Sequence, residues 1–170
     1  DYPYGILPEI GWNMGLSLTK EFRLDYRDGQ IVIDAFRTQF ERQTVVDLDQ
    51  NPQEIVIYSR ERNEVATYRN FATSIQAQVD YELLKRLDIR FAYRWLNQQT
   101  DYLGGAQAKP FLAEHRAFGN IAYETRSDWK FDYTLQWQGA KRLPTTLLNP
   151  EPFQLGSESP AFYLMNAQVT

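Results

Sequence analysis

An alternation of side chains over residues 70–82 constrains the fold most strongly. Every second side chain from Phe71 to Tyr81 is apolar except Thr73, and those between them are polar or small. A period of two residues places the apolar side chains on one side of an extended chain, so this run is a β-strand with two different faces. Soluble strands cluster at about 5 or 6 residues, whereas a tilted strand that crosses a bilayer needs about 9 to 11. The length of the run therefore favours a membrane-spanning strand.

The same alternation recurs along the chain and predicts about seven strands. We expect them over residues 10–24, from residue 30 onward, and over residues 65–82, 87–95, 116–125, 129–137 and from 162 onward. The apolar parity switches near Phe36 and Arg37, which predicts a β-bulge there. Residues 44–63 read as a hairpin that extends beyond the membrane.

The connections between the predicted strands alternate between short and long. Short turns are expected at residues 25–29, where Asp28-Gly29 is a hairpin signal, at 84–87 and at 126–128. Long connections are expected at residues 44–63, 101–114 and 140–160. Outer-membrane barrels have this asymmetry, with tight periplasmic turns and extended extracellular loops. The tryptophans lie near predicted strand ends, as in the aromatic belts of membrane proteins.

Composition excludes several classes of protein. The mean hydropathy is -0.54, and no run approaches the ~18 consecutive apolar residues of a transmembrane helix. The net charge of -4 argues against nucleic acid as a partner. The chain has no cysteine, so disulfides and thiolate metal sites are excluded.

Two other classes of β protein also fit an alternating pattern. A soluble, lipocalin-like ligand-binding barrel would turn its apolar face inward onto a core. A passive porin would share the lipid-facing strands but need no energy source. Common burial of Val79, Tyr93 and Phe131 in a dry centre would favour the soluble barrel.

Several segments together resemble a known family. They are residues 34–38, 70–85, 110–125, 129–139, 141–144 and 160–170. These segments look like the β-barrel portion of TonB-dependent outer-membrane receptors. The resemblance implies an all-β fold, in which this chain forms an antiparallel transmembrane segment of about seven strands from a barrel of about 22.

The resemblance also implies a function and a set of partners. It implies active uptake of a scarce, large nutrient of the ferric siderophore, haem or cobalamin type, in the outer membrane of a Gram-negative bacterium. The expected partners are outer-membrane lipid, the nutrient ligand, the receptor's own plug domain, and the TonB complex acting through that plug. Residues 1–170 would be part of the barrel domain, with the plug and terminal strands outside this chain. No cofactor is implied.

Candidate site residues follow from the polar parity of the predicted strands. The side chains expected to face an aqueous lumen are Glu21, Gln76, Gln78, Asp80, Arg90, Arg94, Arg116, Asp132 and Gln136. His115 is the single histidine, and one histidine at a strand start is more often structural than a metal ligand. No nucleophile and base are arranged for catalysis, so we expect neither an enzyme nor a metal site.

Overall fold

The computed structural model describes residues 5–51, 54–62 and 69–170, and these residues form an all-β, antiparallel structure. The seven long strands are β1 (Ile10–Leu24), β2 (Arg27–Asn51), β4 (Phe71–Leu84), β5 (Leu87–Tyr102), β7 (His115–Glu124), β8 (Lys130–Gln138) and β11 (Phe162–Val169). The short elements are β3 (Glu54–Glu61), β6 (Gly105–Ala108), β9 (Lys141–Arg142), the 3-10 helix η2 (Glu151–Phe153) and β10 (Glu158–Ser159). No helix in the described ranges is long and apolar enough to cross a membrane.

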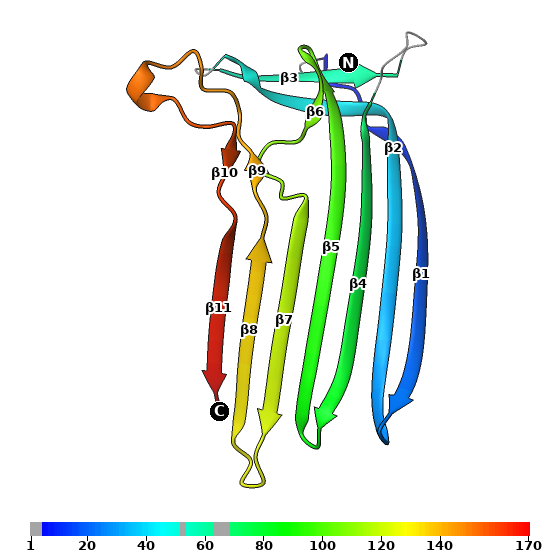
Figure 1. The fold of residues 1–170 in the computed structure, drawn as a ribbon. Coiled ribbons are helices and arrows are strands. Elements are labelled where there is room, and N and C mark those ends of the chain that lie inside the picture. The colour runs from blue at the N-terminus through cyan, green and yellow to red at the C-terminus, as the bar shows by residue number, and fades with distance from the viewer. Residues whose placement is uncertain (1–4, 52–53, 63–68) are drawn as a thin grey trace.

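The long strands form one curved sheet in the order β1-β2-β4-β5-β7-β8-β11 (Figure 1). Seven long strands were predicted, and seven are present on this path. Positions 65–68 of one predicted strand lie outside the described residues. Over the described ranges, β1 and β11 are the two edges of the sheet and do not pair with each other, so no closed barrel is formed.

The two ends of the sheet differ. Three tight connections link β1 to β2, β4 to β5 and β7 to β8 at one end, which we call the turn end (Figure 1). The opposite end, the loop end, carries the longer connections. There β2 continues past its pairing with β1 and β4, bends, and pairs with β3 to form a hairpin across this end of the sheet (Figure 1). The predicted hairpin beyond the main strands is therefore present.

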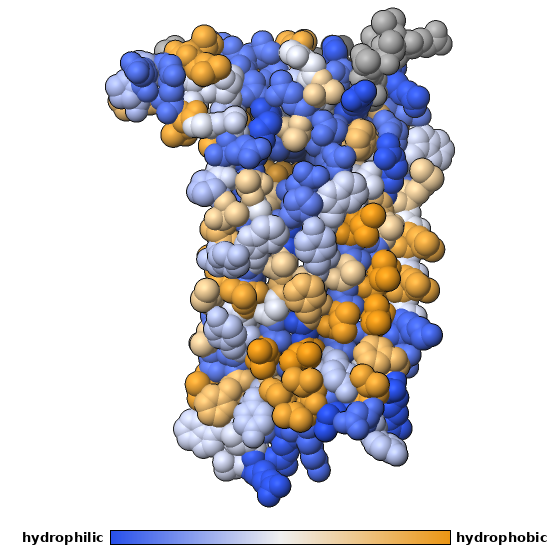
Figure 2. Space-filling view, viewed as in Figure 1, coloured by the Kyte–Doolittle hydropathy of each residue, from blue (hydrophilic) through white to orange (hydrophobic). Residues whose placement is uncertain are grey.

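Strand register gives the sheet one apolar and one polar face. Residues directly opposite each other in adjacent strands share a face. One row across the sheet runs Leu18, Ile33, Ala77, Tyr93, Ala117, Trp137 and Tyr163. A row on the opposite face runs Glu21, Gln30, Asp80, Arg90, Asn120, Thr134 and Asn166. Figure 2 shows hydrophobic side chains gathered over the middle of the strands, with hydrophilic ones at both ends.

The first tight turn lies within the predicted residues 25–29 but before the Asp28-Gly29 pair that was expected to make it. The Asp28-Gly29 signal was misleading, because both residues already belong to β2. The turn is made by Asp25 and Tyr26, whose φ angles of 52° and 60° are those of a two-residue hairpin of type I′. Gly29 instead lies opposite Phe22, whose ring would be 2.3 Å from a Cβ at that glycine.

The predicted β-bulge near Phe36 is also wrong. Pairing of β2 with β1 and β4 is regular through Phe36 and Arg37, and the shift in register lies between Ile10 and Gly11. Phe36 lies on the polar face because Gly15, directly opposite, has no side chain to exclude its ring. Arg37 lies on the apolar face, where it donates a hydrogen bond to Thr73 Oγ1 at 2.9 Å.

The long connections contain more regular structure than predicted. The expected loop at residues 101–114 begins inside β5, which pairs with β6 through Thr100 and Asp101. Residues 140–160 contain the β9–β10 pair and η2. The most buried side chains of the described residues gather at this loop end, and they are Gln43, Val45, Asp47, Asn70, Thr100, Tyr102 and Ala113. Among the described residues, side chains buried to this degree therefore lie at the loop end and not in the middle of the long sheet.

Candidate functional site

All nine side chains predicted to face a lumen lie on the polar face. The register joins them through directly opposed pairs: Asp80 with Arg90, Gln76 with Arg94, and Arg94 with Arg116. Glu21 shares a row with Asp80, while Gln78, Gln136 and Asp132 occupy adjacent rows on the same side. Every one of the nine lines one of three hollows on this face. The polar face therefore carries all of the predicted side chains and contributes them to these hollows.

The largest hollow has a volume of about 1120 Å³ and lies toward the turn end. Asp80 and Arg90 form an ion pair in its wall. Gln78 Nε2 also donates to Asp80 Oδ2 at 2.6 Å, so both carboxylate oxygens are occupied. Glu21 lines this hollow from β1. Both arginines in its wall are paired, Arg90 with Asp80 and Arg23 with Asp28, while Glu21, Glu82 and Asp88 leave an excess of acidic side chains.

A second polar group lies between β7 and β8. Asn120 Nδ2 donates to both oxygens of Asp132, at 3.1 and 3.0 Å, and to Thr134 Oγ1 at 2.9 Å. Thr134 in turn donates to Asp132 Oδ1 at 3.3 Å. This network fixes the Asp132 carboxylate against the wall of a hollow of about 360 Å³.

The third hollow, of about 210 Å³, lies nearer the loop end. Gln76, Arg94, Arg116 and Gln136 line it together with Phe118. Arg94 and Arg116 occupy directly opposed positions on β5 and β7. This hollow therefore has two cationic side chains in its wall and no acidic one, whereas both arginines of the first hollow have acidic partners.

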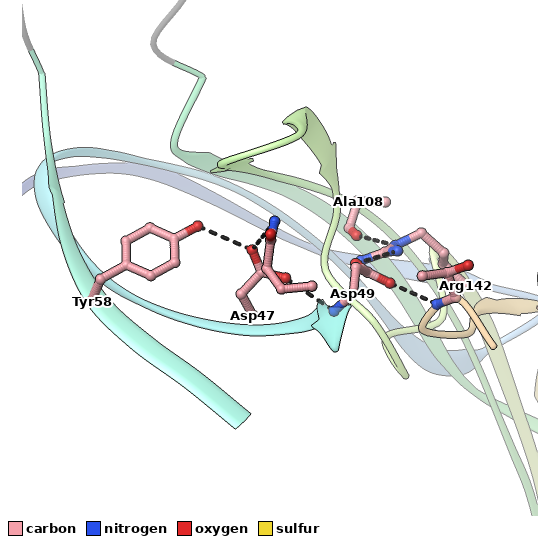
Figure 3. A network of polar contacts seen from close by, with 7 residues as sticks. Asp47, Asp49, Tyr58, Ala108 and Arg142 are labelled. Carbon is pink, nitrogen blue, oxygen red and sulfur yellow. Dashed lines mark hydrogen bonds and ion pairs between the residues drawn. The ribbon is translucent and has the colours of Figure 1, made fainter. Parts of the chain in front are cut away.

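The sequence did not predict a second polar cluster, which lies at the loop end (Figure 3). Asp49 Oδ2 accepts a hydrogen bond from Arg142 Nη1 at 2.9 Å, and Asp49 Oδ1 accepts one from the Thr145 backbone at 2.7 Å. Arg142 Nε donates to the carbonyl of Ala108 at 2.6 Å. These contacts join the β2–β3 hairpin to the end of β6, to β9 and to the segment that follows β9.

Asp47 organises the other half of this cluster. Its side chain is fully buried. Oδ2 accepts hydrogen bonds from the Tyr58 hydroxyl at 3.2 Å and from Gln50 Nε2 at 3.3 Å, while Oδ1 accepts from the Asp49 backbone at 3.0 Å. Burial raises the pKa of Tyr58 to about 12, and the Asp47 carboxylate acts in the same direction. The Tyr58 hydroxyl is therefore held neutral, as a donor, at physiological pH.

Arg142 also approaches an aromatic ring at the loop end. Its guanidinium carbon lies 5.6 Å from the centre of the Tyr102 ring, within the range of a cation–π contact. Burial raises the pKa of Tyr102, although the nearby Arg142 opposes that shift. A hollow of about 460 Å³ beside these residues is lined by Tyr102, Arg142, Pro144 and Leu147, among others. The arrangement is a firmly held polar corner next to an apolar recess.

His115 makes a local contact on the apolar face. Its Nδ1 is 2.7 Å from the Tyr93 hydroxyl, and the two rings are stacked with centroids 6.1 Å apart. The neighbouring Glu114 accepts a hydrogen bond from Trp95 Nε1 at 2.8 Å. In the part of the chain that the structure describes, no group of three or more His, Cys, Asp or Glu side chains could hold a metal ion.

Comparisons of this chain with protein-family models, curated proteins and solved structures found no match.

Proposed function

We propose that this chain forms part of the wall of an outer-membrane β-barrel in a Gram-negative bacterium. The observation that carries this proposal is the position of the large apolar side chains on the face opposite the hollows. Leu16 and Leu18 are 73% and 61% exposed, and Phe91 on β5 is 56% exposed. Soluble monomers rarely expose so extended an apolar surface, whereas a bilayer covers one.

The same exposures argue against a soluble, lipocalin-like barrel. Such a barrel would bury its apolar face in a common core. Tyr93 and Phe131 are 38% and 44% exposed, and Val79 is only partly buried. Opposite them, the hollows are lined by glutamine, asparagine and charged side chains. A barrel in lipid requires this arrangement, in which apolar side chains face the bilayer and polar side chains face the interior of the barrel.

We propose further that the complete barrel is a TonB-dependent receptor for a scarce, large nutrient. The resemblance of the strand segments to that family is the basis for this step, and the wide polar hollow and the elaborate loop end are compatible with it. A ferric siderophore, haem or cobalamin would enter from the loop end. A plug domain within the barrel would transmit the pull of the TonB complex. The polar-face side chains would then contact water, the plug or the passing nutrient.

The test is energy-dependent uptake by the intact protein. The gene is disrupted in its host, and uptake of labelled ferric siderophores, haem and cobalamin is compared with that of the complemented strain, with and without a protonophore. The proposal predicts that uptake of one nutrient class is lost on disruption, returns on complementation and stops with the protonophore. Uptake that persists with the protonophore would assign a passive porin instead.

A further inference from the structure

Arg94 and Arg116 place two like charges in direct opposition on the polar face. They are register partners on β5 and β7. Side chains so placed have Cβ atoms about 4.5 to 5.5 Å apart, and like charges there destabilise a sheet. A favourable interaction is therefore expected to offset the repulsion.

No acidic side chain in the described ranges supplies that interaction. The ion pairs among these residues involve neither Arg94 nor Arg116. Arg116 Nε is buried without a hydrogen-bond partner. Arg90, by contrast, lies on the same face of β5 and is paired with Asp80.

The side chains next to the two arginines in their own row are neutral, and the nearby Glu114 carboxylate accepts a hydrogen bond from Trp95. In their row across the sheet, Gln76 lies beside Arg94 and Gln138 lies beside Arg116. The nearest acid along this row is Asp34, which is two strands away from Arg94, or about 10 Å. Its Oδ1 already accepts a hydrogen bond from Ser17 at 2.6 Å. The third hollow is thus a concave, doubly cationic site with amide groups at both ends.

We propose that Arg94 and Arg116 together bind one carboxylate group in this hollow. Each guanidinium presents a planar fork of N–H donors that matches a carboxylate, and two forks from opposed strands can hold its two oxygens. The amides of Gln76 and Gln138 add further donors at the rim. The carboxylate can come from either of two sources. It belongs to a dissolved organic acid, or to an acidic side chain of a protein segment that lies against the polar face. The site depends on the polar face alone and not on transport.

Thermal unfolding of the complete protein in detergent tests this site. Melting temperatures are measured in sodium acetate and in sodium chloride at equal ionic strength, for the wild type and for R94Q, R116Q and the double variant. R23Q is the matched control, because Arg23 lies on the same face and is paired with Asp28 at 3.4 Å. R94K/R116K keeps both charges without the planar forks and serves as a second probe if the double glutamine variant does not fold.

A dissolved carboxylate predicts that acetate raises the melting temperature above that in chloride. The shift should disappear in R94Q/R116Q, diminish in R94K/R116K and persist in R23Q. If the carboxylate comes from the protein itself, acetate should have no effect on the melting temperature. Each single glutamine variant should then melt below the wild type. The double variant should lose less in melting temperature than the sum of the two single losses. The proposal is overturned if acetate has no effect and the glutamine variants melt at the wild-type temperature or above it. That result would mean that the substitutions only relieve the repulsion between the two arginines.

Discussion

Asp49 and Arg142 are 93 residues apart in sequence, yet Asp49 Oδ2 lies 2.9 Å from Arg142 Nη1. Their side chains are only 14% and 19% exposed. Through this contact the β2–β3 hairpin is held against the connection that follows β8. The loop end is therefore a packed unit and not a set of independent loops.

Replacing Asp49 with alanine should loosen this unit. The substitution removes the acceptor for Arg142 and for the Thr145 backbone, and hydrogen bonds to charged groups contribute about 1.5 to 3 kcal/mol each. We expect amide hydrogen exchange to accelerate in residues 141–147 and in the hairpin. Glu124→Ala is the control, because its contact with Lys130 is exposed and 4.0 Å long. Equal exchange in the wild type and D49A would contradict this role.

Gly15 should not tolerate a side chain while Phe36 is present. A Cβ at Gly15 would lie 2.3 Å from the Phe36 ring, so Gly15→Ala forces the ring to move. We expect a loss of about 1 to 3 kcal/mol in the free energy of unfolding, measured with denaturant in detergent micelles. Phe36→Leu in the G15A background should restore part of it. Gly119→Ala has nothing within 4 Å of the added atom and should cost little; a similar loss there would show that the Phe36 contact is not the cause.

Stability of the loop end should fall in strongly alkaline solution. Tyr58 has a pKa of about 12 in the folded protein, against 10.0 for an ordinary tyrosine. Because the folded pKa is the higher one, the stabilisation is complete below about pH 10 and is lost as the pH rises from 10 to 12. Hydrogen exchange across this range should show the loss, and Tyr58→Phe should reduce its slope. The slope should not vanish, since the pKa of Tyr102 is also raised. An unchanged slope in Y58F would contradict the assignment.

Lys20 offers a test of what covers the apolar face. Among the side chains of β1 that lie on the apolar face, it is the one that is charged, and it lies opposite Ile31 of β2. A lysine on a lipid-facing strand costs about 2 to 4 kcal/mol at the bilayer midplane and less near the interfaces. Lys20→Leu should therefore stabilise the complete protein against denaturant in phospholipid vesicles, whereas Glu21→Leu on the polar face should not. Equal effects of the two substitutions would count against lipid on this side.

Alternation predicted the two faces well because a strand has a period of two whatever its neighbours are. Residues 70–82 and 129–137 therefore indicated which side chains share a side before any pairing was known. Turn placement was less certain, since Gly29 could serve either a turn or a close contact. The contact with Phe22 decided it, and that contact depends on register.

Contacts between distant segments have no local signal in the sequence. The ion pair between Asp49 and Arg142 depends on how β2 bends beyond its pairing with β4, which no periodicity encodes. The opposition of Arg94 and Arg116 likewise depends on the register of two strands separated by a long connection. Both arginines were predicted to lie on the polar face, but their direct opposition required the structure.

The most direct test of the central claim is the environment of the two faces. Spin labels are placed singly at Ile75, Phe91 and Leu135 on the apolar face, and at Gln76, Arg90 and Gln136 on the polar face, of the complete protein in vesicles. Their accessibility to a lipid-soluble and a water-soluble relaxation agent is then compared. A membrane barrel predicts that the first set responds to the lipid-soluble agent and the second to the water-soluble one. The opposite pattern, or an apolar set that neither agent reaches, would contradict it.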